Sequence, residues 1–497
     1  MKNYISNNVS FRQNNVASIR TPGYGRGLRK LSAIALSIGA LCVHSNVIAA
    51  GKTGEFVEYF ADNGFSTPVA VVNSPAGVHA NGVTYISYQG DETDPYVVSY
   101  NHETKEWTGP YKAGVSELGK DKASARDSHG KPTMVLDDLG YIHIFYGGHG
   151  GSDKFGENTL GNTNRGMNKH AVSTKPYDIS SFEDLDNISP FGNYNQAIKM
   201  DNGDIYLFYR HGAHRSDWVY QKSTDNGRTF EEPVSFLTVS PREDIDAHDS
   251  WYIWVTRGEG DELIISYDYH VCWNTTSKQF KARGHTAERN SLFYMVYDTK
   301  NNTWKNVKGE VLTAPVDRDQ SLAKTLVAQT PNGHWTFNGS VHLDNNGLPN
   351  VTINSGEDQG KRTWGGPKQT LHYRWDGEKW LGGNPVNPIA QKKKLDTRGD
   401  FFLNSDGELT YALGYRQGNH GYVGYFSSDD GGKSFKQTHE LLKVDKSAFA
   451  MSPIITNAHP EARFIAAQKV PGEKTWRKMF LIGDNGAVER LKSEAER

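Results

Sequence analysis

The sequence predicts an all-β protein, a seven-bladed β-propeller of four-stranded antiparallel blades. Three observations lead to this fold. Apolar and polar residues alternate with a period of two in short segments such as 83–88 (VTYISY), 141–146 (YIHIFY) and 204–209 (DIYLFY), as β-strands require. Turns rich in Gly, Asn and Asp separate these segments. The strand-and-turn unit then recurs along the chain, which is the sequence signature of a propeller.

Each repeat consists of an inner strand, a tight turn such as 137–140 (DDLG), an aromatic-rich strand and one or two outer strands. We place the starts of the seven repeats near Val69, Lys131, Tyr194, Asp249, Gly339, Gly399 and Ser452. We expect the segment 55–60 (EFVEYF) to complete the last blade and so close the ring.

Two turns, 223–230 (STDNGRTF) and 427–435 (SSDDGGKSF), resemble the Asp-box turns of sialidase-like propellers. Their Asp and Gly residues are those that a tight outer hairpin needs, so we assign them a structural role. Two longer inserts, 150–168 and 274–290, interrupt the repeats. Inserted loops on a rigid scaffold are the usual place for binding sites.

The N-terminus has the features of a secretory signal. A basic stretch that contains Arg26 and Arg29 precedes the apolar run 31–43, and small residues follow at 46–50. The expected domains are a signal peptide at 1–50 and a single propeller domain at 51–497. No later segment approaches the ~20 apolar residues of a membrane-spanning helix. We therefore expect a secreted protein, extracellular or periplasmic, that does not associate with a membrane after cleavage.

The overall charge argues against a nucleic-acid partner. The 497 residues carry a net charge of −2 and the pI is near 6.8, whereas phosphate binding needs a strongly basic surface. We expect a monomer. Signal cleavage leaves Cys272 as the one remaining cysteine. An internal disulfide is therefore excluded, and the thiol is buried, free or a metal ligand.

Titratable residues flank the strands of three adjacent repeats. His129 precedes one inner strand and His149 follows its hairpin partner, and antiparallel pairing brings these two ends together. Tyr194 and Arg210 occupy the same places in the next repeat, and His248 precedes the fourth inner strand. Taken singly, each could be an ordinary rim histidine or a cation–π arginine. Their coincidence at one rim favours a functional site.

A metal site is predicted beside this rim. His270 and Cys272 are two positions apart on a predicted strand, so both project to the same side. His214 and His285 are the nearest candidates to complete a four-ligand site. Closed sites of this kind hold zinc and are structural. The alternative is a buried thiol among ordinary histidines, because this is no tight C-x-x-C pattern.

Segments 127–150, 193–218 and 267–273 resemble the ulvan lyases of polysaccharide lyase family 25, which are secreted seven-bladed propellers of marine bacteria. In that family a histidine, a tyrosine and an arginine carry out an elimination reaction. The resemblance implies that the matching catalytic residues are His129, Tyr194 and Arg210, with His149 as the accompanying histidine. It also implies one structural zinc ion on His214, His270, Cys272 and His285, and no organic cofactor.

The residue types fit an elimination across C4 and C5 of a uronic acid. That reaction removes a proton next to a carboxylate, so positive charge or hydrogen bonding must stabilise the intermediate. The planar fork of Arg210 matches two carboxylate oxygens. Tyr194 and His129 are the candidate acid and base, and the sequence does not decide which residue removes the proton.

Ulvan is a sulfated anionic polysaccharide, so we expect further cations and aromatic platforms in the cleft. The candidate substrate-binding residues are His248, Tyr252, Arg318, Arg362 and Trp364, with Arg398 and Arg416 also near blade ends.

Two other functions remain open from the residues alone. A sialidase-like glycoside hydrolase would share the Asp-box turns, but the arginine cluster, Tyr/Glu pair and acidic donor that it needs are not evident. A non-catalytic propeller would use the same rim only to bind an anionic polysaccharide and would leave its length unchanged.

Overall fold

The computed structural model describes residues 54–120, 127–284, 288–360, 367–387, 398–404, 406–469 and 472–496. One compact unit runs from residue 53 to residue 497. The predicted signal peptide lies outside the described residues. Within the described part of the chain, no helix is long and apolar enough to cross a membrane.

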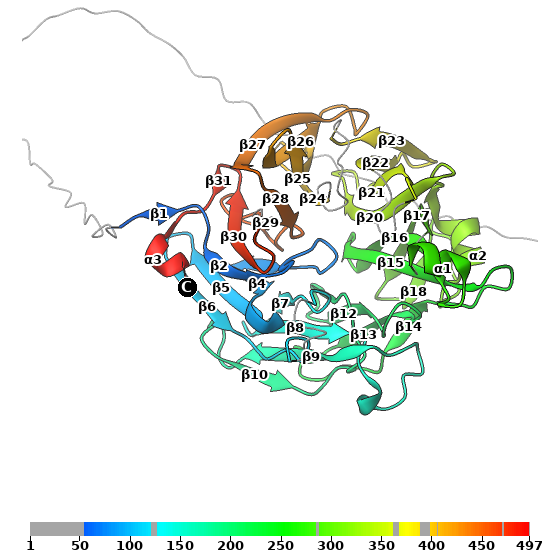
Figure 1. The fold of residues 1–497 in the computed structure, drawn as a ribbon, viewed down its shortest axis with the longest axis horizontal. Helices are drawn as coiled ribbons and strands as arrows, with labels where there is room; N and C mark the ends of the chain where they lie inside the picture. The colour runs from blue at the N-terminus through cyan, green and yellow to red at the C-terminus, as the bar shows by residue number, and fades with distance from the viewer. Residues whose placement is uncertain are drawn as a thin grey trace, which may run out of the picture. The chain divides into compact units, whose positions relative to one another are not determined.

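Seven antiparallel sheets are arranged around a centre as the blades of a propeller, which confirms the predicted fold (Figure 1). From the centre outward, the first three blades contain β3 (Gly77–Ala80), β4 (Val83–Gln89), β5 (Pro95–Asn101) and β6 (Trp107–Lys112); β7 (Thr133–Leu136), β8 (Ile142–His149), β9 (Arg165–Ser173) and β10 (Phe182–Leu185); and β11 (Gln196–Lys199), β12 (Ile205–Arg210), β13 (Trp218–Ser223) and β14 (Val234–Leu237).

The remaining blades follow the same order. They contain β15 (Ala247–Arg257), β16 (Glu262–Trp273), β17 (Glu288–Asp298) and β18 (Thr303–Lys305), with β19 (Leu326–Ala328) beside β17; β20 (His334–Leu343), β21 (Pro349–Glu357), β22 (Gln369–Trp375) and β23 (Trp380–Pro385); β24 (Gly399–Leu403), β25 (Leu409–Gln417), β26 (His420–Ser428) and β27 (Lys436–Asp445); and β28 (Ala448–Met451), β29 (Phe464–Lys469), β30 (Trp476–Gly483) and β2 (Ala61–Phe65), with β31 (Gly486–Ala487) beside β30.

Only short helices accompany the strands in the described ranges. They are η1 (Asp91–Thr93), η2 (Asp153–Phe155), α1 (Lys278–Arg283), α2 (Arg318–Gln320), η3 (Ser321–Thr325) and α3 (Lys492–Ala495).

The ring is closed by strand β2, which pairs antiparallel with β30 of the last blade, so the blue N-terminal strand lies beside the red C-terminal one in Figure 1. The segment 55–60 was expected to do this. Instead β1 (Phe56–Val57) pairs with β32 (Arg490–Leu491), and the closing strand begins directly after the predicted segment. The prediction was therefore wrong by a few residues, because apolar alternation is strongest in 55–60 and weak in the closing strand.

Four predicted blade starts lie close to the observed ones, but three differ. Strand β28 is Ala448–Met451, so it ends before the predicted start near Ser452. Strand β20 begins at His334 and not near Gly339, because the register shifts between Asn338 and Val341 and the glycine lies inside this bulge. Strand β3 begins at Gly77 and not near Val69. The buried residues 69–76 are an approach to the blade rather than part of its sheet.

Large aromatic side chains fill the space between blades. Trp218 and Trp251 are fully buried between the third and fourth blades. The indole nitrogen of Trp218 donates to the backbone oxygen of Trp251 (2.9 Å), and that of Trp251 donates to the backbone oxygen of Thr238 (2.7 Å). Each indole therefore buries its apolar surface without losing its hydrogen bond. This packing holds the blade ends at fixed positions.

Both Asp-box turns use their polar groups internally. In the second turn, Asp430 accepts hydrogen bonds from the backbone of Lys433 (2.9 Å) and Ser434 (3.0 Å), and the Ser428 hydroxyl accepts from the backbone of Gly432 (2.7 Å). Gly432 has a φ of +80°, and a Cβ there would lie 2.0 Å from the buried ring of His372. Only glycine fits at this position.

Replacing this glycine should destabilise the fold more than replacing an unconfined one. For Gly432→Ala we expect a loss of ~2–5 kcal/mol in the free energy of unfolding, from left-handed backbone strain plus overpacking. Gly418 is the matched control, since its φ is +58° and a Cβ would meet nothing within 4 Å. Gly418→Ala should lower the free energy of unfolding only by the contribution of backbone strain, ~1–2 kcal/mol. Equal losses in urea unfolding would contradict the packing argument.

Candidate active site

The predicted histidine pair lies at the rim where the inner strands begin. His129 precedes β7 and His149 ends β8, and their rings stack with centroids 3.6 Å apart and planes 13° apart. Tyr194 presents its ring to that of His129 in a T-shaped arrangement, with centroids 5.7 Å apart. The structure therefore brings together three of the four predicted catalytic side chains from two adjacent blades.

A buried carboxylate that we did not predict binds both histidines. The Asp127 side chain is 1% exposed. One of its oxygens accepts from Nδ1 of His129 (2.5 Å), and the other accepts from Nδ1 of His149 (2.5 Å) and from Nε and Nη2 of Arg165 (2.9 and 2.8 Å). An ionised carboxylate only accepts hydrogen bonds, so each neutral imidazole carries its proton on Nδ1. Nε2 of each ring is then left as a proton acceptor.

The environment keeps both imidazoles neutral. Burial lowers the pKa of His129 and of His149, although the carboxylate of Asp127 opposes this shift. Burial alone would raise the pKa of Asp127, but hydrogen bonds from the two imidazoles outweigh it and hold that pKa well below its usual range. At neutral pH the group therefore consists of one carboxylate and two neutral rings, of which one is a suitable general base.

Tyr194 adopts an unusual backbone conformation, with a φ of +61°. A bulky residue rarely occupies this left-handed region, and such strain is commonly found at functional sites. Burial and the neighbouring Tyr252 raise the pKa of Tyr194 well above its usual value, although Arg210 opposes the shift. The hydroxyl therefore keeps its proton at neutral pH.

Arg210, the last residue of β12, is fully buried. Its guanidinium carbon lies 5.1 Å from the ring centroid of Tyr194 and 5.4 Å from that of Tyr252. Nε is 3.4 Å from the backbone oxygen of Gly212, but neither terminal nitrogen has a hydrogen-bond partner among the described residues. Buried donors are almost always satisfied. This pair of adjacent donors is therefore suited to a planar, bidentate anion such as a carboxylate.

Known proteins match this chain closely. Residues 83–384 match a family model described as a BNR repeat-containing family member. An ulvan lyase of Alteromonas sp. (strain LOR) is 54% identical over 439 residues, 88% of this chain and 89% of that protein. The ulvan lyase PL25 of Pseudoalteromonas sp. (strain PLSV) is 51% identical over 474 residues, 95% of each chain. The chain belongs to the ulvan lyases of polysaccharide lyase family 25.

Solved structures agree with this. A family 25 ulvan lyase structure superposes with a TM-score of 0.84 at 53% identity, covering 89% of this chain and 100% of that one. A second structure, with the same coverage and TM-score, was solved bound to -[GlcA(1-4)Rha3S]-.

In this family 25 lyase, the structure describes three of the five predicted substrate-binding residues. Tyr252 lies at the rim, because its ring is 5.4 Å from that of Tyr194. His248 is paired with Cys272 across β15 and β16 and is half-buried. Arg318 in α2 lies over the ring of Tyr269, on the opposite face of the β16 strand from Cys272. Arg362 and Trp364 fall outside the described residues.

Buried cations surround Tyr252 and Tyr194. Arg289 lies 4.3 Å from the ring of Tyr252 and forms a buried ion pair with Asp268 (2.6 Å). Burial lowers the pKa of Arg398 to about 10, and Arg289 contributes to this. Burial also lowers the pKa of Lys131 to about 7. Arg398 was among the predicted cations. The sequence analysis did not identify the cations Arg289 and Lys131 or the carboxylate of Asp268 that pairs with Arg289. Arg416, near the end of β25, is only half-buried.

The predicted zinc residues are close together where they are described. His270 and Cys272 are both buried on β16, and the ring of His214 lies 5.7 Å from that of His270. Burial raises the pKa of the Cys272 thiol, although Arg215 opposes the shift. His285 falls outside the described residues. Two imidazoles and a thiol on one side of a strand form a donor set that suits Zn²⁺.

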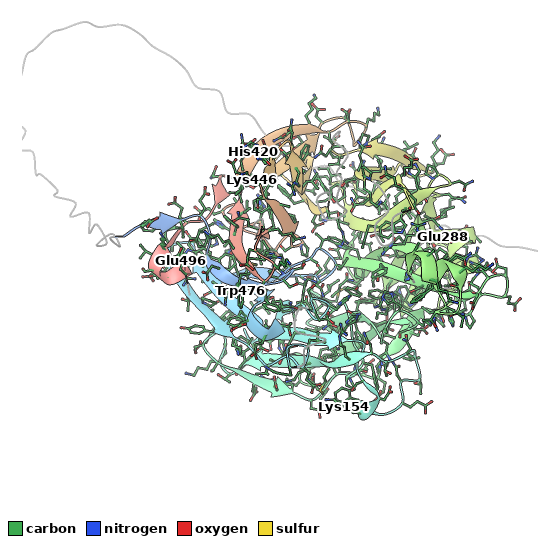
Figure 2. The ribbon with its side chains drawn as sticks, in the orientation of Figure 1. Lys154, Glu288, His420, Lys446, Trp476 and Glu496 are labelled. Carbon is green, nitrogen blue, oxygen red and sulfur yellow. The ribbon has the colours of Figure 1, made fainter. Side chains whose placement is uncertain are left out.

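The insert at 150–168 joins two blades and contributes to the rim. Asn158 donates to the backbone oxygen of His211 in the third blade (2.7 Å), and Arg165 binds Asp127. Lys154 of the same insert lies at the periphery of the propeller (Figure 2). The insert thus brings Arg165, which the sequence analysis did not identify, to the histidine pair.

The carboxylate of Asp127 should control the titration of both histidines. In the intact protein, we expect the pKa of His129 to lie below 6.5. In Asp127→Asn it should fall further, because the charge that favours imidazolium is gone. Titration of the ring Cε1–H resonances in histidine-labelled protein measures this directly. Asp137→Asn is the control, since Asp137 pairs with His143 at the other end of the same blade. A rise in the pKa of His129 in Asp127→Asn would contradict the proposed tautomers.

Proposed function

We propose that this protein cleaves ulvan by β-elimination at uronate residues and releases oligosaccharides with an unsaturated uronyl end. The observation that carries this proposal is the buried fork of Arg210 beside Tyr194 and the histidine pair. Binding of -[GlcA(1-4)Rha3S]- by a relative of 53% identity supports a uronate next to a sulfated rhamnose as the substrate.

Arg210 binds the uronate carboxylate through its two terminal nitrogens. Removal of the C5 proton places negative charge on this carboxylate, and a preorganised guanidinium in a buried site stabilises that charge strongly. The tyrosine rings at 5.1 and 5.4 Å hold the guanidinium in place and partly compensate its desolvation.

His129 serves as the base and Tyr194 as the acid. Nε2 of His129 accepts the C5 proton, the C5–H electrons form the C4=C5 double bond, and the C4–O4 bond breaks. The departing O4 takes the proton of the Tyr194 hydroxyl. The raised pKa of Tyr194 favours this order, because a phenol that holds its proton is an acid in the ground state. The opposite assignment would require a phenolate.

The cations near the histidine pair and near Tyr252 bind the anionic groups around the cleaved bond. Lys131, with a pKa of about 7, would gain charge when a sulfate or carboxylate arrives. Arg289 and Arg398 contribute further positive charge at the same rim. A sialidase-like hydrolase or a binding-only propeller would use the same cations, but neither needs the pairing of a neutral imidazole with a protonated phenol.

We also infer that the protein acts outside the cytoplasm, as a monomer, after loss of the segment 1–50. The basic and apolar pattern of that segment and the size of a polysaccharide substrate support the location outside the cytoplasm. We further propose that His214, His270, Cys272 and His285 hold one structural zinc ion. Such an ion would fix the insert that follows Cys272 and would take no part in the elimination.

The lyase proposal is tested by absorbance at the unsaturated-uronate band. Purified protein should raise it with ulvan and leave it unchanged with alginate, heparin or pectin. Tyr194→Phe should lower kcat by ~10²–10⁴ because it removes the proton donor, and Arg210→Lys should also be severely impaired. Tyr209→Phe is the control, because its buried hydroxyl donates to Gln221 (2.7 Å) and not to a proposed catalytic residue. Reducing ends without absorbance would identify a hydrolase, and unchanged ulvan length would identify a binding protein.

The zinc proposal is tested by metal content and stability. Cys272→Ser should lose the bound zinc and melt at a lower temperature, while kcat measured well below the melting temperature should fall much less than in Tyr194→Phe. Elemental analysis of the intact protein should give stoichiometric zinc. Unchanged metal content in Cys272→Ser would remove this cysteine from the site.

A further inference from the structure

A second group of histidines lies far from the rim, at the end of the blades where the inner strands finish. His79 is in β3, His102 directly follows β5, and His459 precedes β29. The ring centroids of His102 and His459 are 3.8 Å apart, and His79 lies 5.1 and 5.2 Å from these two rings. The catalytic mechanism uses none of them.

A hydrogen-bond chain orders this group. Nδ1 of His102 donates to a carboxylate oxygen of Glu461 (3.0 Å), and the Thr84 hydroxyl lies 2.8 Å from Nε2 of His102. The same hydroxyl lies 3.0 Å from Nδ1 of His79. The backbone N–H of Glu461 donates to Nδ1 of His459 (3.2 Å). Both ring nitrogens of His102 are therefore held in place.

One ligand atom from each of His102, His459 and Glu461 lies within 4.8 Å of the others. Two imidazoles and a carboxylate are typical ligands of Zn²⁺ and of neighbouring transition metals. The Thr84 contact also fits, because the second nitrogen of a ligand histidine is usually hydrogen-bonded. The Glu461 side chain is 40% exposed, so an ion can reach this group from solvent.

We propose that His102, His459 and Glu461 form a binding site for a divalent transition-metal ion such as Zn²⁺, separate from the site at Cys272. Nδ1 of His102 becomes a ligand when this neutral ring carries its proton on Nε2, where it donates to the Thr84 hydroxyl. The ion takes the place of the ammonium of Lys105, which lies 2.9 and 2.8 Å from the two oxygens of Glu461. The Lys105 side chain is 55% exposed and can turn into solvent.

The proposed ligands come from two different blades, so a bound ion would connect them. His102 belongs to the first blade, whereas His459 and Glu461 belong to the last, and these blades meet where β2 closes the ring. An ion that binds only the folded protein stabilises it. Here it would connect the two blades at the junction that depends on pairing between the chain ends.

Calorimetric titration with Zn²⁺ of the mature protein, stripped by a chelator and reloaded with one equivalent, tests the proposal. We expect a second equivalent to bind. Co²⁺ distinguishes the sites, because a thiolate-to-metal absorption band accompanies binding at Cys272 and none accompanies binding by imidazole and carboxylate alone.

Three variants identify the ligands. His459→Ala should lower the affinity for the second equivalent of Zn²⁺ at least tenfold. His439→Ala, at an exposed histidine on β27, should leave that affinity unchanged. Lys105→Gln should tighten binding several-fold because it removes the competing ammonium. The proposal is overturned by the absence of a second equivalent, by unchanged affinity in His459→Ala, or by a thiolate band from the second Co²⁺. If His459→Ala does not fold, unchanged or weaker binding in Lys105→Gln overturns it.

Discussion

The buried carboxylate of Asp127 is the constraint on which the rim depends. Two imidazoles would not remain stacked at 3.6 Å in one orientation without a common acceptor that fixes both Nδ1 protons. The carboxylate in turn needs Arg165, because an ionised group that is 1% exposed must be paired to be tolerated. One residue thus links the segment before β7, the end of β8 and the start of β9.

Around this centre, burial shifts the pKa values of neighbouring groups in opposite directions. It lowers the pKa of His129 and raises that of Tyr194, and the guanidinium of Arg210 lies between two aromatic rings. A proton acceptor, a proton donor and an anion-binding fork are therefore present together at neutral pH. The scaffold contributes rigidity, because each group stands at the end of a strand whose register is set by a packed blade.

The sequence predicted the parts of this arrangement that follow from periodicity. Antiparallel pairing was sufficient to place His129 beside His149, and repetition of the unit was sufficient to place Tyr194 and Arg210 beside them. Asp127 could not be recognised in the same way, because its hydrogen bonds to His149 and Arg165 are tertiary contacts that form only in the folded protein. Its position two residues before His129 was the available signal.

Closure by β2 also has a consequence for how the protein reaches its folded state. Arg490 binds the backbone oxygen of Phe60 across 430 residues of chain, and β2 pairs with β30 over a similar separation. During synthesis from the N-terminus, the earliest strand has no partner until nearly the whole polypeptide exists. An unpaired strand invites aggregation, and short, weakly apolar strands limit that hazard. The five residues of β2, ADNGF, have this character. The composition that made this strand hard to predict from the sequence therefore also limits aggregation before β2 pairs with β30.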